Sequence, residues 1–303
     1  MENRILVLGS EGFIGKKFIE FQKALDFPHK NLFMVDIREI TKQNYYKCDA
    51  SNYENLNSII QKIVPGEIYN FSGSFSNIFE LDYMNNVTVS KNIFDSIIQN
   101  KLTDCKVLIN GSAAEYGYIK EYSYPVNEDS SLNPISFYGL SKVYQTFLAK
   151  TYFLREKVNV FVTRPFNIIG YGISNKLFIG RLISEIEQNI TRGKKITLGN
   201  LDNERDYLDI DDLLKAYNLI MERGTPGEVY NIGFGKSIKM LDLLRIFLEV
   251  FSIDIKEVEL SKDFVRRFDV PKIVGDISKL KKLNWHPTIS LKESISKIKT
   301  RFQ

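Results

Sequence analysis

The stretch at residues 4–15 constrains the fold of this chain more than any other. It reads Arg-Ile-Leu-Val-Leu-Gly-Ser-Glu-Gly-Phe-Ile-Gly. Residues 5–8 form an apolar run without a polar break, which is typical of a parallel strand buried on both faces. Gly9, Gly12 and Gly15 follow at once, and a helical pattern of apolar residues follows them. The pattern therefore predicts a strand, a tight glycine turn and a helix.

A glycine turn between a strand and a helix suits a phosphate-bearing ligand. Its first glycine lets the backbone bend and approach a pyrophosphate, and a later one lets helix and strand pack closely. Free N–H groups at the helix start then face the phosphates. A glycine triplet alone is also compatible with an ordinary tight turn. Because a strand precedes it and a helix follows, we favour a dinucleotide site. The residues expected to line it are Gly9, Glu11, Gly12, Phe13, Ile14 and Gly15.

A second predicted strand at residues 31–36 ends in an acid. Asp36 lies 21 residues past Gly15, near the spacing at which a carboxylate meets the adenosine ribose hydroxyls. The alternative is a helix or turn cap. An acid there repels a 2′-phosphate, whereas Arg38, two residues on, is able to bind one. We therefore expect Asp36, Ile37 and Arg38 at the adenosine end, and both NADH and NADPH stay open as cofactors.

Strand and helix patterns alternate through the first half of the chain. Residues 67–71, 106–109 and 158–163 read as strands, and residues 53–63 and 85–98 read as helices. Such alternation predicts an α/β fold with a Rossmann-type, doubly wound parallel sheet. Asp49 precedes the first of these helices, where it is able to cap the helix, to reach the adenine amino group, or both. The further residues expected along the cofactor are Asp49, Ala50, Phe71, Ser72 and Gly73.

Three side chains form the candidate catalytic set. Tyr138 and Lys142 stand four residues apart, so a helix places both on one face. A free tyrosine has a pKa of about 10, too high for easy proton exchange at neutral pH. A neighbouring ammonium favours the phenolate and is expected to lower that pKa, and it is also able to bond the nicotinamide ribose. Ser112 follows a strand, where such sheets bind ligands, and its hydroxyl is able to hold a substrate oxygen.

Composition excludes several other classes of protein. The net charge is +4, and lysines are interspersed with acids, so no nucleic-acid footprint is expected. Cys48 and Cys105 lie far apart without neighbouring metal ligands, so we expect neither a disulfide framework nor a metal site. The chain enters a strand directly, and no apolar run is long enough to span a membrane. We therefore expect a cytoplasmic protein.

The glycine motif and the Tyr138-x-x-x-Lys142 motif together resemble those of the extended short-chain dehydrogenases/reductases. The resemblance extends over nearly the whole chain. It implies that Ser112, Tyr138 and Lys142 are catalytic and that Asp36 and Asp49 hold the adenosine. The string Arg-Pro-Phe-Asn at residues 164–167 also matches the family. It implies that Pro165 lines the nicotinamide and that Asn167 meets a nucleotide-sugar. Homodimers that pair through the tyrosine-bearing helix are common in this family.

The strict alternation lapses after residue 170, which predicts a smaller C-terminal α/β lobe for the substrate. We expect a cofactor domain at residues 1–167, with 206–233 returning to it, and a lobe made of 168–205 and 234–303. The string at residues 199–202, followed by Arg205-Asp206, resembles GDP-mannose dehydratases and GDP-6-deoxy-4-keto-mannose reductases. The strings at residues 266–271 and 274–276 look most like those reductases; related TDP- and CDP-sugar enzymes share the arginines. The resemblance implies that Arg205 and Arg266 clamp a diphosphate and Asp269 a ribose. The implied substrate residues are Ser74, Ser112, Asn167, Leu198, Asn200, Arg205, Arg266 and Asp269.

Departures from the family pattern indicate which reaction is carried out. The dehydratases carry Thr-Asp-Glu or Thr-Ser-Glu where this chain has Ser112-Ala113-Ala114-Glu115. Both acid positions of the first form are alanine, although a shifted alignment brings Glu115 back as a candidate. GDP-fucose synthases, which epimerise before they reduce, use a cysteine and a histidine. Ala114 stands at that cysteine position, and the two histidines lie far away in sequence.

Carbonyl reduction is the reaction that these residues favour. Our hypothesis is an NAD(P)H-dependent reductase of the C4 ketone of a nucleotide-activated 4-keto-6-deoxy sugar, with GDP-4-keto-6-deoxy-mannose favoured. The alternatives are a UDP-hexose 4-epimerase, a nucleotide-sugar 4,6-dehydratase, and a non-catalytic cofactor-sensing protein on the same fold. The sequence leaves the face of hydride delivery and the nucleotide base open.

Overall fold

A seven-stranded parallel sheet forms the larger part of the molecule. The structure, a computed structural model, describes residues 3–119, 123–261 and 269–302. The strand order is β10-β6-β5-β4-β1-β2-β3, and neighbouring strands run parallel throughout. The strands are β1 (Ile5–Leu8), β2 (Leu32–Asp36), β3 (Tyr45–Lys47), β4 (Glu67–Asn70), β5 (Lys106–Asn110), β6 (Asn159–Pro165) and β10 (Val229–Ile232). This order reverses between β1 and β4, so the prediction of a doubly wound sheet is confirmed.

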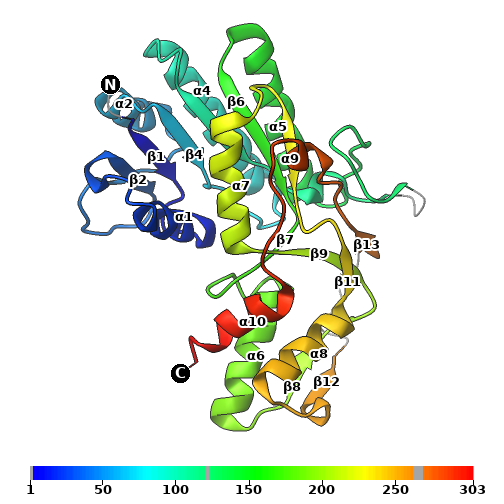
Figure 1. Cartoon of the computed structure of the whole chain (residues 1–303). Helices are drawn as coiled ribbons and strands as arrows, with labels where there is room; N and C mark the ends of the chain where they lie inside the picture. Colours follow the sequence, from blue (N-terminus) through cyan, green and yellow to red (C-terminus); the bar gives the residue numbers. More distant parts are fainter. Residues whose placement is uncertain (1–2, 120–122, 262–268, 303) are drawn as a thin grey trace.

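Helices cover both faces of this sheet (Figure 1). One face carries α1 (Phe13–Ala24) and α7 (Ile210–Arg223), and the other carries α2 (Tyr53–Ile63), α4 (Val89–Gln99) and α5 (Phe137–Glu156). Strand β1 explains why both layers form. Ile5 and Val7 enter the core beneath α1 and α7, whereas Leu6 and Leu8 enter the core beneath the other three helices. Alternate residues point to opposite faces, so a strand with two buried faces must be apolar throughout.

The segment before α4 is helical but irregular. It consists of α3 (Phe79–Asp82) and a π-helical turn, η2 (Tyr83–Thr88), which continues directly into α4. The sequence predicts one helix over residues 85–98, and the structure places a π turn in its first part. Turns of this kind widen the helix locally and are frequent at functional sites. Here the turn packs against α5, the helix that carries Tyr138.

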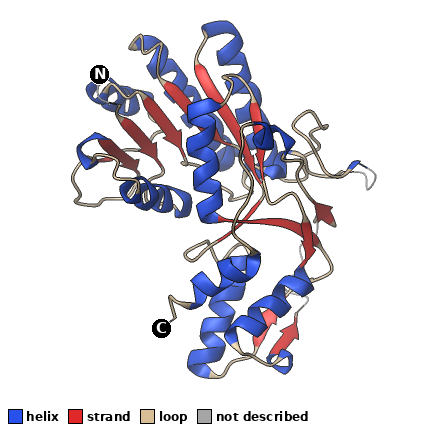
Figure 2. Ribbon diagram, viewed as in Figure 1, coloured by secondary structure: helices blue, strands red, loops and turns tan. Residues whose placement is uncertain are grey.

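The second part of the chain builds a smaller α/β lobe, visible beneath the large sheet in Figure 2. Strands β11, β9 and β13 form a sheet in that order, with β7 also paired to β9, while β12 pairs with β8. Helices α6, α8 and α10 bury a separate apolar core against these strands. The elements are β7 (Asn167–Ile169), α6 (Phe178–Arg192), β8 (Ile196–Leu198), β9 (Glu204–Asp209), β11 (Ser237–Lys239), α8 (Met240–Phe251), β12 (Val258–Leu260), β13 (Lys272–Ile273) and α10 (Leu291–Lys299).

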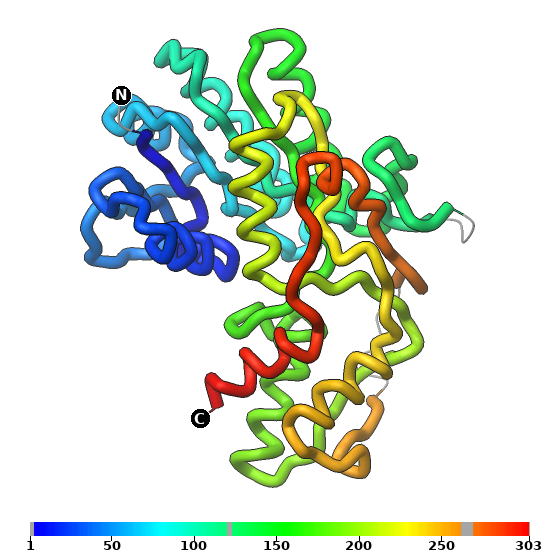
Figure 3. The backbone as a smooth tube through the Cα atoms, viewed as in Figure 1, coloured from blue at the N-terminus to red at the C-terminus, as the bar shows by residue number. Residues whose placement is uncertain are grey.

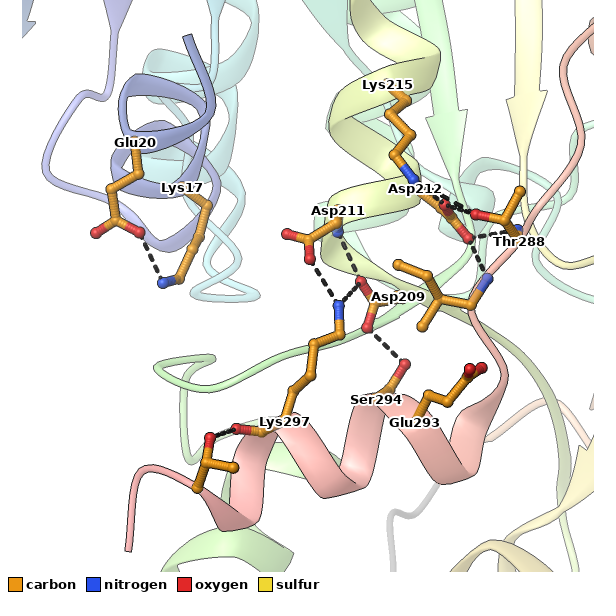
Figure 4. A network of polar contacts seen from close by, with 12 residues as sticks. Lys17, Glu20, Asp209, Asp211, Asp212, Lys215, Thr288, Glu293, Ser294 and Lys297 are labelled. Carbon is orange, nitrogen blue, oxygen red and sulfur yellow. Dashed lines mark hydrogen bonds and ion pairs between the residues drawn. The ribbon is translucent and has the colours of Figure 1, made fainter. Parts of the chain in front are cut away.

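A polar network joins α10 to the start of α7 (Figure 4). Asp209, the N-cap of α7, accepts hydrogen bonds from Ser294 Oγ at 2.5 Å and from Lys297 Nζ at 3.0 Å. One turn further on, the buried carboxylate of Asp212 accepts the backbone N–H groups of Thr288 and Ile289. Charge-assisted bonds to a buried carboxylate are strong, so this network fixes the lobe to the large sheet.

The C-terminal segment runs beside the large sheet before it reaches the lobe (Figure 3). Helix α9 (Ser278–Lys282) contacts β10, and Ile277, Leu280 and Trp285 belong to the core under α1 and α7. The predicted division assigned this segment to the lobe. We propose instead that residues 277–285 belong with the cofactor domain. For the other residues, we keep the predicted division between the cofactor domain and the lobe. Within the described residues, no helix has the length and apolar character required to cross a membrane.

Candidate active site

The glycine turn forms a cradle at the carboxyl end of β1. Gly9 has a φ of +70°, and a Cβ there would lie 2.5 Å from the backbone nitrogen of Ser72. A Cβ on Gly15 would lie 2.2 Å from the carbonyl oxygen of Gly9. Only glycine permits both approaches. Between them, the buried hydroxyl of Ser10 has no partner among the described residues. Phe13 and Ile14 are partly buried against the core below. The cradle fits the pyrophosphate of a dinucleotide.

The acid predicted at the adenosine end lies beside this turn. Asp36 accepts the backbone N–H of Glu11 at 2.9 Å and that of Arg38 at 3.2 Å. The Arg38 guanidinium donates to the carbonyl oxygen of Glu11 at 3.0 Å, and Ile37 is 66% exposed. The carboxylate of Glu11 is buried and paired with Lys42 at 2.7 Å. Asp36 is therefore held in place at the end of β2, with the arginine folded back over the turn.

One part of the predicted role of Asp49 is wrong. Helix α2 is capped by Asn52, whose side chain accepts the N–H of Asn55, because Asn52 is the residue directly before the helix. Asp49 is exposed and instead accepts the N–H and hydroxyl of Ser51. Its expected contact with the adenine amino group stays a prediction. Ala50 is buried next to it, and its carbonyl oxygen accepts from Asn92 at 3.0 Å.

The loop after β4 is fixed by a buried acid. Asp82 has no exposed surface and accepts the hydroxyl of Ser74 at 2.7 Å, together with the N–H groups of Ser76 and Asn77. The hydroxyl of Ser74, predicted to meet substrate, is thus turned toward Asp82. Before it in the loop, Phe71 and Ser72 pack against the glycine turn, and Gly73 is exposed.

Ser112 begins the short helix η3 (Ala113–Glu115) after β5. Its hydroxyl accepts the N–H of Ala114 at 3.1 Å, and Glu115 accepts the N–H of Ser112 at 3.0 Å, which completes a capping box. The other oxygen of Glu115 accepts from Thr146 Oγ1 and Arg164 Nε, both at 2.8 Å. Neither ionic side chain of this pair is exposed beyond 2%. Glu115 therefore ties η3, α5 and β6 together in the interior.

Tyr138 is the second residue of α5, in its first turn. Ser136 caps the helix by accepting the N–H of Gly139 at 3.0 Å. The Ser112 side chain lies close enough to the phenol to lower its pKa, so the structure brings these two predicted residues together. The ring of Phe75 packs against it edge-on, with 6.3 Å between the ring centres.

Lys142 lies one helical turn further along and is only 4% exposed. Its Nζ donates to the carbonyl oxygen of Asn110 at 2.7 Å and to Gln145 Oε1 at 3.0 Å. It lies 5.9 Å from the centre of the Tyr138 ring. A Cβ built on Gly73 would be 3.6 Å from Nζ, so the ammonium lies between the ends of β4 and β5.

The prediction that Lys142 lowers the pKa of Tyr138 is wrong for this structure. Burial raises the pKa of Tyr138 to about 12; the hydrogen bond from Ser112 lowers it in part, and the charges of Glu115 and Asp82 raise it further. Burial also lowers the pKa of Lys142 to about 8. The ammonium is directed to Asn110 and Gln145 rather than to the phenol oxygen, so desolvation dominates both groups. Tyr138 is therefore a neutral phenol at neutral pH.

The structure brings together two of the residues predicted to bind a diphosphate and ribose. Arg205, on β9, bonds Asp269 at 2.7 Å, and its guanidinium also donates to the carbonyl oxygen of Glu204. Asn203 donates to the second oxygen of Asp269 at 2.7 Å. Ile273, which pairs with Arg205 across the sheet, packs with Ala113 next to Ser112. Arg266 lies outside the described residues.

The remaining predicted site residues lie at strand ends. Pro165 is the last residue of β6 and is buried. Asn167 donates to the carbonyl oxygen of Asp206 at 3.3 Å. The side chain of Leu198 is fully buried in the core of the lobe, and its backbone pairs with β12. The side chain itself is therefore not exposed to a substrate. Asn200 is exposed and accepts the N–H of Asp202.

Sequence reasoning missed the groups that support Lys142. Asn110 contributes a backbone carbonyl, which any residue type provides, so no side-chain signal marks it. Asn86 lies in the π turn. Because the turn departs from regular helical spacing, the sequence does not show which of its residues face α5. Gln145, three residues after Lys142, does carry a signal, because this spacing places both on one face of a helix.

A family model described as GDP-mannose 4,6 dehydratase matches residues 6–298. The GDP-6-deoxy-D-talose 4-dehydrogenase of Aggregatibacter actinomycetemcomitans is 28% identical over 283 residues, which cover 91% of this chain and 90% of that protein. The GDP-6-deoxy-D-mannose reductase of Pseudomonas aeruginosa is 28% identical over 187 residues, which cover 60% and 61%.

Solved structures share the fold over almost the whole length. RMD from Pseudomonas aeruginosa, complexed with NADPH, has a TM-score of 0.83 at 23% identity and covers 98% of both chains. A UDP-glucose 4-epimerase from Thermotoga maritima with UDP-glucose has a TM-score of 0.87 at 24% identity and covers 99% of this chain and 98% of that one. With the sheet order and the glycine cradle described above, the match over residues 6–298 shows that the chain belongs to the GDP-mannose 4,6 dehydratase family.

Proposed function

We propose that this protein is an NAD(P)H-dependent oxidoreductase that reduces the C4 ketone of a nucleotide-activated 4-keto-6-deoxy sugar. GDP-4-keto-6-deoxy-mannose is the favoured substrate. The proximity of the Ser112 side chain to a protonated Tyr138 carries the proposal. A ketone that accepts a hydride must also accept a proton on its oxygen, and a neutral phenol is the form of tyrosine that donates one.

Each residue of the site has a separate task in this proposal. The bound cofactor supplies the hydride. The hydroxyl of Ser112 orients the sugar carbonyl, and Tyr138 Oη donates its proton to the C4 oxygen. Lys142, held by Asn110 and Gln145, has one N–H donor left for the nicotinamide ribose. The cradle at Gly9 and the acid Asp36 hold the pyrophosphate and the adenosine ribose.

The state of Glu115 favours reduction over dehydration. Loss of water from C5 and C6 of a sugar needs an acid–base pair that reaches the substrate. Glu115 is the nearest acid to Ser112 in sequence, but it is fully buried and bound to Ser112, Thr146 and Arg164. Its neighbours at positions 113 and 114 are alanines. Even if Glu115 is aligned with the acid of the dehydratases, its carboxylate is bound in the interior and does not reach a substrate.

The names of two relatives support a guanosine-linked 6-deoxy sugar. One is a GDP-6-deoxy-D-talose 4-dehydrogenase and the other a GDP-6-deoxy-D-mannose reductase. Arg205 and Asp269, already joined at 2.7 Å, are proposed to meet the diphosphate and the nucleotide ribose, since a guanidinium suits bidentate binding of phosphate. A cytoplasmic location stays a prediction.

A homodimer fits an exposed apolar face over α5 and η2. Tyr144 and Phe147 on α5 are 42% and 54% exposed, and Tyr83 and Met84 on η2 are 41% and 42% exposed. Tyr83 and Tyr144 contact each other edge-on, so these side chains form one surface. Apolar patches of this kind mark interfaces. We propose a second copy of the chain as the occupant.

Stoichiometry of the cofactor tests the proposed function. The protein is incubated with GDP-4-keto-6-deoxy-mannose and either NADH or NADPH, and the sugar product is identified by NMR. Reduction predicts one equivalent of reduced cofactor consumed for each sugar converted. Conversion of a UDP-hexose without added cofactor would indicate epimerisation. Tight cofactor binding without turnover on any keto-sugar nucleotide would indicate a cofactor-sensing protein. Either result would overturn the proposal.

A further inference from the structure

The ammonium of Lys142 is held by two neutral oxygen acceptors. One is the carbonyl oxygen of Asn110 at 2.7 Å, and the other is the side-chain oxygen of Gln145 at 3.0 Å. An ammonium has three N–H donors, so one donor is left for another partner. The position of Nζ beside Gly73 places it next to the exposed loop after β4.

The orientation of the Gln145 amide is fixed by its other contacts. Its Nε2 donates to the carbonyl oxygen of Asn86 at 2.8 Å and to Ser90 Oγ at 2.7 Å. Both N–H groups are thus satisfied, and the side chain is 1% exposed. A flipped amide would put N–H donors against the ammonium and lose both bonds. The oxygen must therefore face Lys142.

The same network holds the loop that flanks the site. Asn86 donates to the carbonyl oxygen of Ser74 at 3.0 Å and to Ser141 Oγ at 2.8 Å, and it accepts the N–H of Ser74 at 3.0 Å. Gln145 thus connects Lys142 to the π turn and, through it, to the loop after β4. Satisfied buried networks of this kind fix side chains in one arrangement.

The charged groups around Lys142 shift its pKa in the direction opposite to that caused by burial. Desolvation lowers the pKa of Lys142, and the carboxylates of Glu115 and Asp82 raise it. The ring of Tyr138 lies on the remaining side. Gln145 adds an acceptor without adding a charge, so it stabilises the ammonium and leaves it cationic toward a ligand.

We propose that Gln145 is a positioning residue that holds the ammonium of Lys142 between the ends of β4 and β5, where the cofactor is expected, and sets the pH range in which that ammonium persists. The kinetic part of this inference rests on the proposed function. The part that concerns Lys142 does not, because cofactor affinity and its pH dependence are measured without sugar.

Two substitutions of opposite chemistry test the inference. Gln145→Met keeps the length of the side chain but removes the acceptor, and Gln145→Glu keeps an acceptor and adds a negative charge. Gln61→Met, an exposed glutamine on α2, is the matched control. For each variant, NADH affinity is measured across pH by the fluorescence of the bound cofactor, and kcat/KM is measured on the keto-sugar nucleotide.

The two variants are expected to shift the pH profile in opposite directions. The alkaline midpoint of NADH affinity moves down by about one pH unit in Gln145→Met and up by about one in Gln145→Glu, because the ammonium loses an acceptor in one and gains a counter-charge in the other. The control does not move. The alkaline limb of kcat/KM follows the same shifts.

Profiles that stay at the wild-type pH in both variants, or that move in the same direction, would overturn the inference. If Gln145→Met does not fold, Gln145→Glu alone decides by the sign of its shift. If no variant, nor the wild-type protein, turns over the sugar nucleotide, the proposed function fails, while the cofactor profiles still report on Gln145.

Discussion

Tyr138 is a neutral phenol at neutral pH, because burial raises its pKa to about 12, and this is the form that the proposed proton transfer requires. The side chain of Ser112 lies beside the phenol and lowers its pKa in part. Lys142 is buried as well, and its charge is supported by neutral oxygens rather than by a carboxylate in contact. At this scale the site is arranged to give a proton to a ketone.

Replacement of Tyr138 by phenylalanine tests the proton donor. The ring and its packing against Phe75 are kept, and only the hydroxyl is lost. General acid catalysis contributes about 100- to 10,000-fold, so we expect kcat to fall by that range while the Kd for NADH or NADPH changes little. Turnover at the wild-type rate in Tyr138→Phe would contradict the assignment.

Because the pKa of Lys142 is low, we expect the free energy of unfolding to depend on pH. Its pKa is lowered from 10.5 to about 8 in the folded protein, so the unfolded chain binds more protons in that window and stability rises with pH. Between pH 8 and about pH 9.5, we expect the unfolding free energy of the wild type to rise by about 2 kcal/mol relative to Lys142→Met. Urea unfolding of both proteins at each pH measures this, and a constant difference would contradict it.

The capped helix η3 shows how an element holds Ser112, the proposed catalytic serine. Its capping box fixes the backbone of Ser112, and the buried pair of Glu115 and Arg164 fixes η3 to β6. Burial raises the pKa of Glu115, while Arg164 and the hydrogen bonds lower it in part. This element therefore contributes to stability and to the placement of Ser112, not to proton transfer.

Loss of the Glu115 charge is expected to destabilise the fold. Breaking a buried ion pair costs about 3–5 kcal/mol when one partner stays charged, so Glu115→Gln should lower the unfolding free energy by several kcal/mol. Glu187→Gln, at an exposed position on α6, serves as the control. If Glu115→Gln keeps its stability and loses turnover, Glu115 acts in the chemistry and the dehydratase alternative gains ground.

The sequence predicts regular elements well and irregular ones poorly. Strand β1 and helix α2 lie at their predicted bounds, because an unbroken apolar run and a clean 3.6-residue period mark them. The π turn at residues 83–88 escapes prediction, since its period differs from that of a regular helix. The sequence offers Asp49 as one possible cap of α2, and the structure shows Asn52 in that role; both residue types suit a cap, and only the backbone decides.

At the scale of the whole molecule, the core of the lobe is separate from the cores on the two faces of the large sheet, and polar contacts join the lobe to α7. The carboxylates at the start of α7 hold α10 and the segment before it, and Ile273 connects β13 to η3. The sequence predicts that Tyr138 and Lys142 share one face of a helix by their spacing. It does not predict the bond between Arg205 and Asp269, which are 64 residues apart, because that bond depends on a tertiary contact.

The proposed dimer face gives a prediction at this scale. Phe147 is 54% exposed near the middle of α5, and a lysine there would bring a charge into an apolar interface. We expect the wild-type protein to have the mass of a dimer in light scattering and Phe147→Lys to have that of a monomer. Ile190→Lys, at an exposed apolar site on α6, should leave the mass unchanged. A monomeric wild-type protein, or a dimeric Phe147→Lys, would contradict the dimer.

The most direct test of the central claim is to follow the hydride itself. NADH or NADPH that carries deuterium at the transferable position is mixed with GDP-4-keto-6-deoxy-mannose and the wild-type protein, and the product is examined by NMR. The account predicts deuterium bonded to C4 of the sugar, with one equivalent of cofactor oxidised, and almost no product with Tyr138→Phe. A product without deuterium at C4, or conversion without net oxidation of the cofactor, would contradict it.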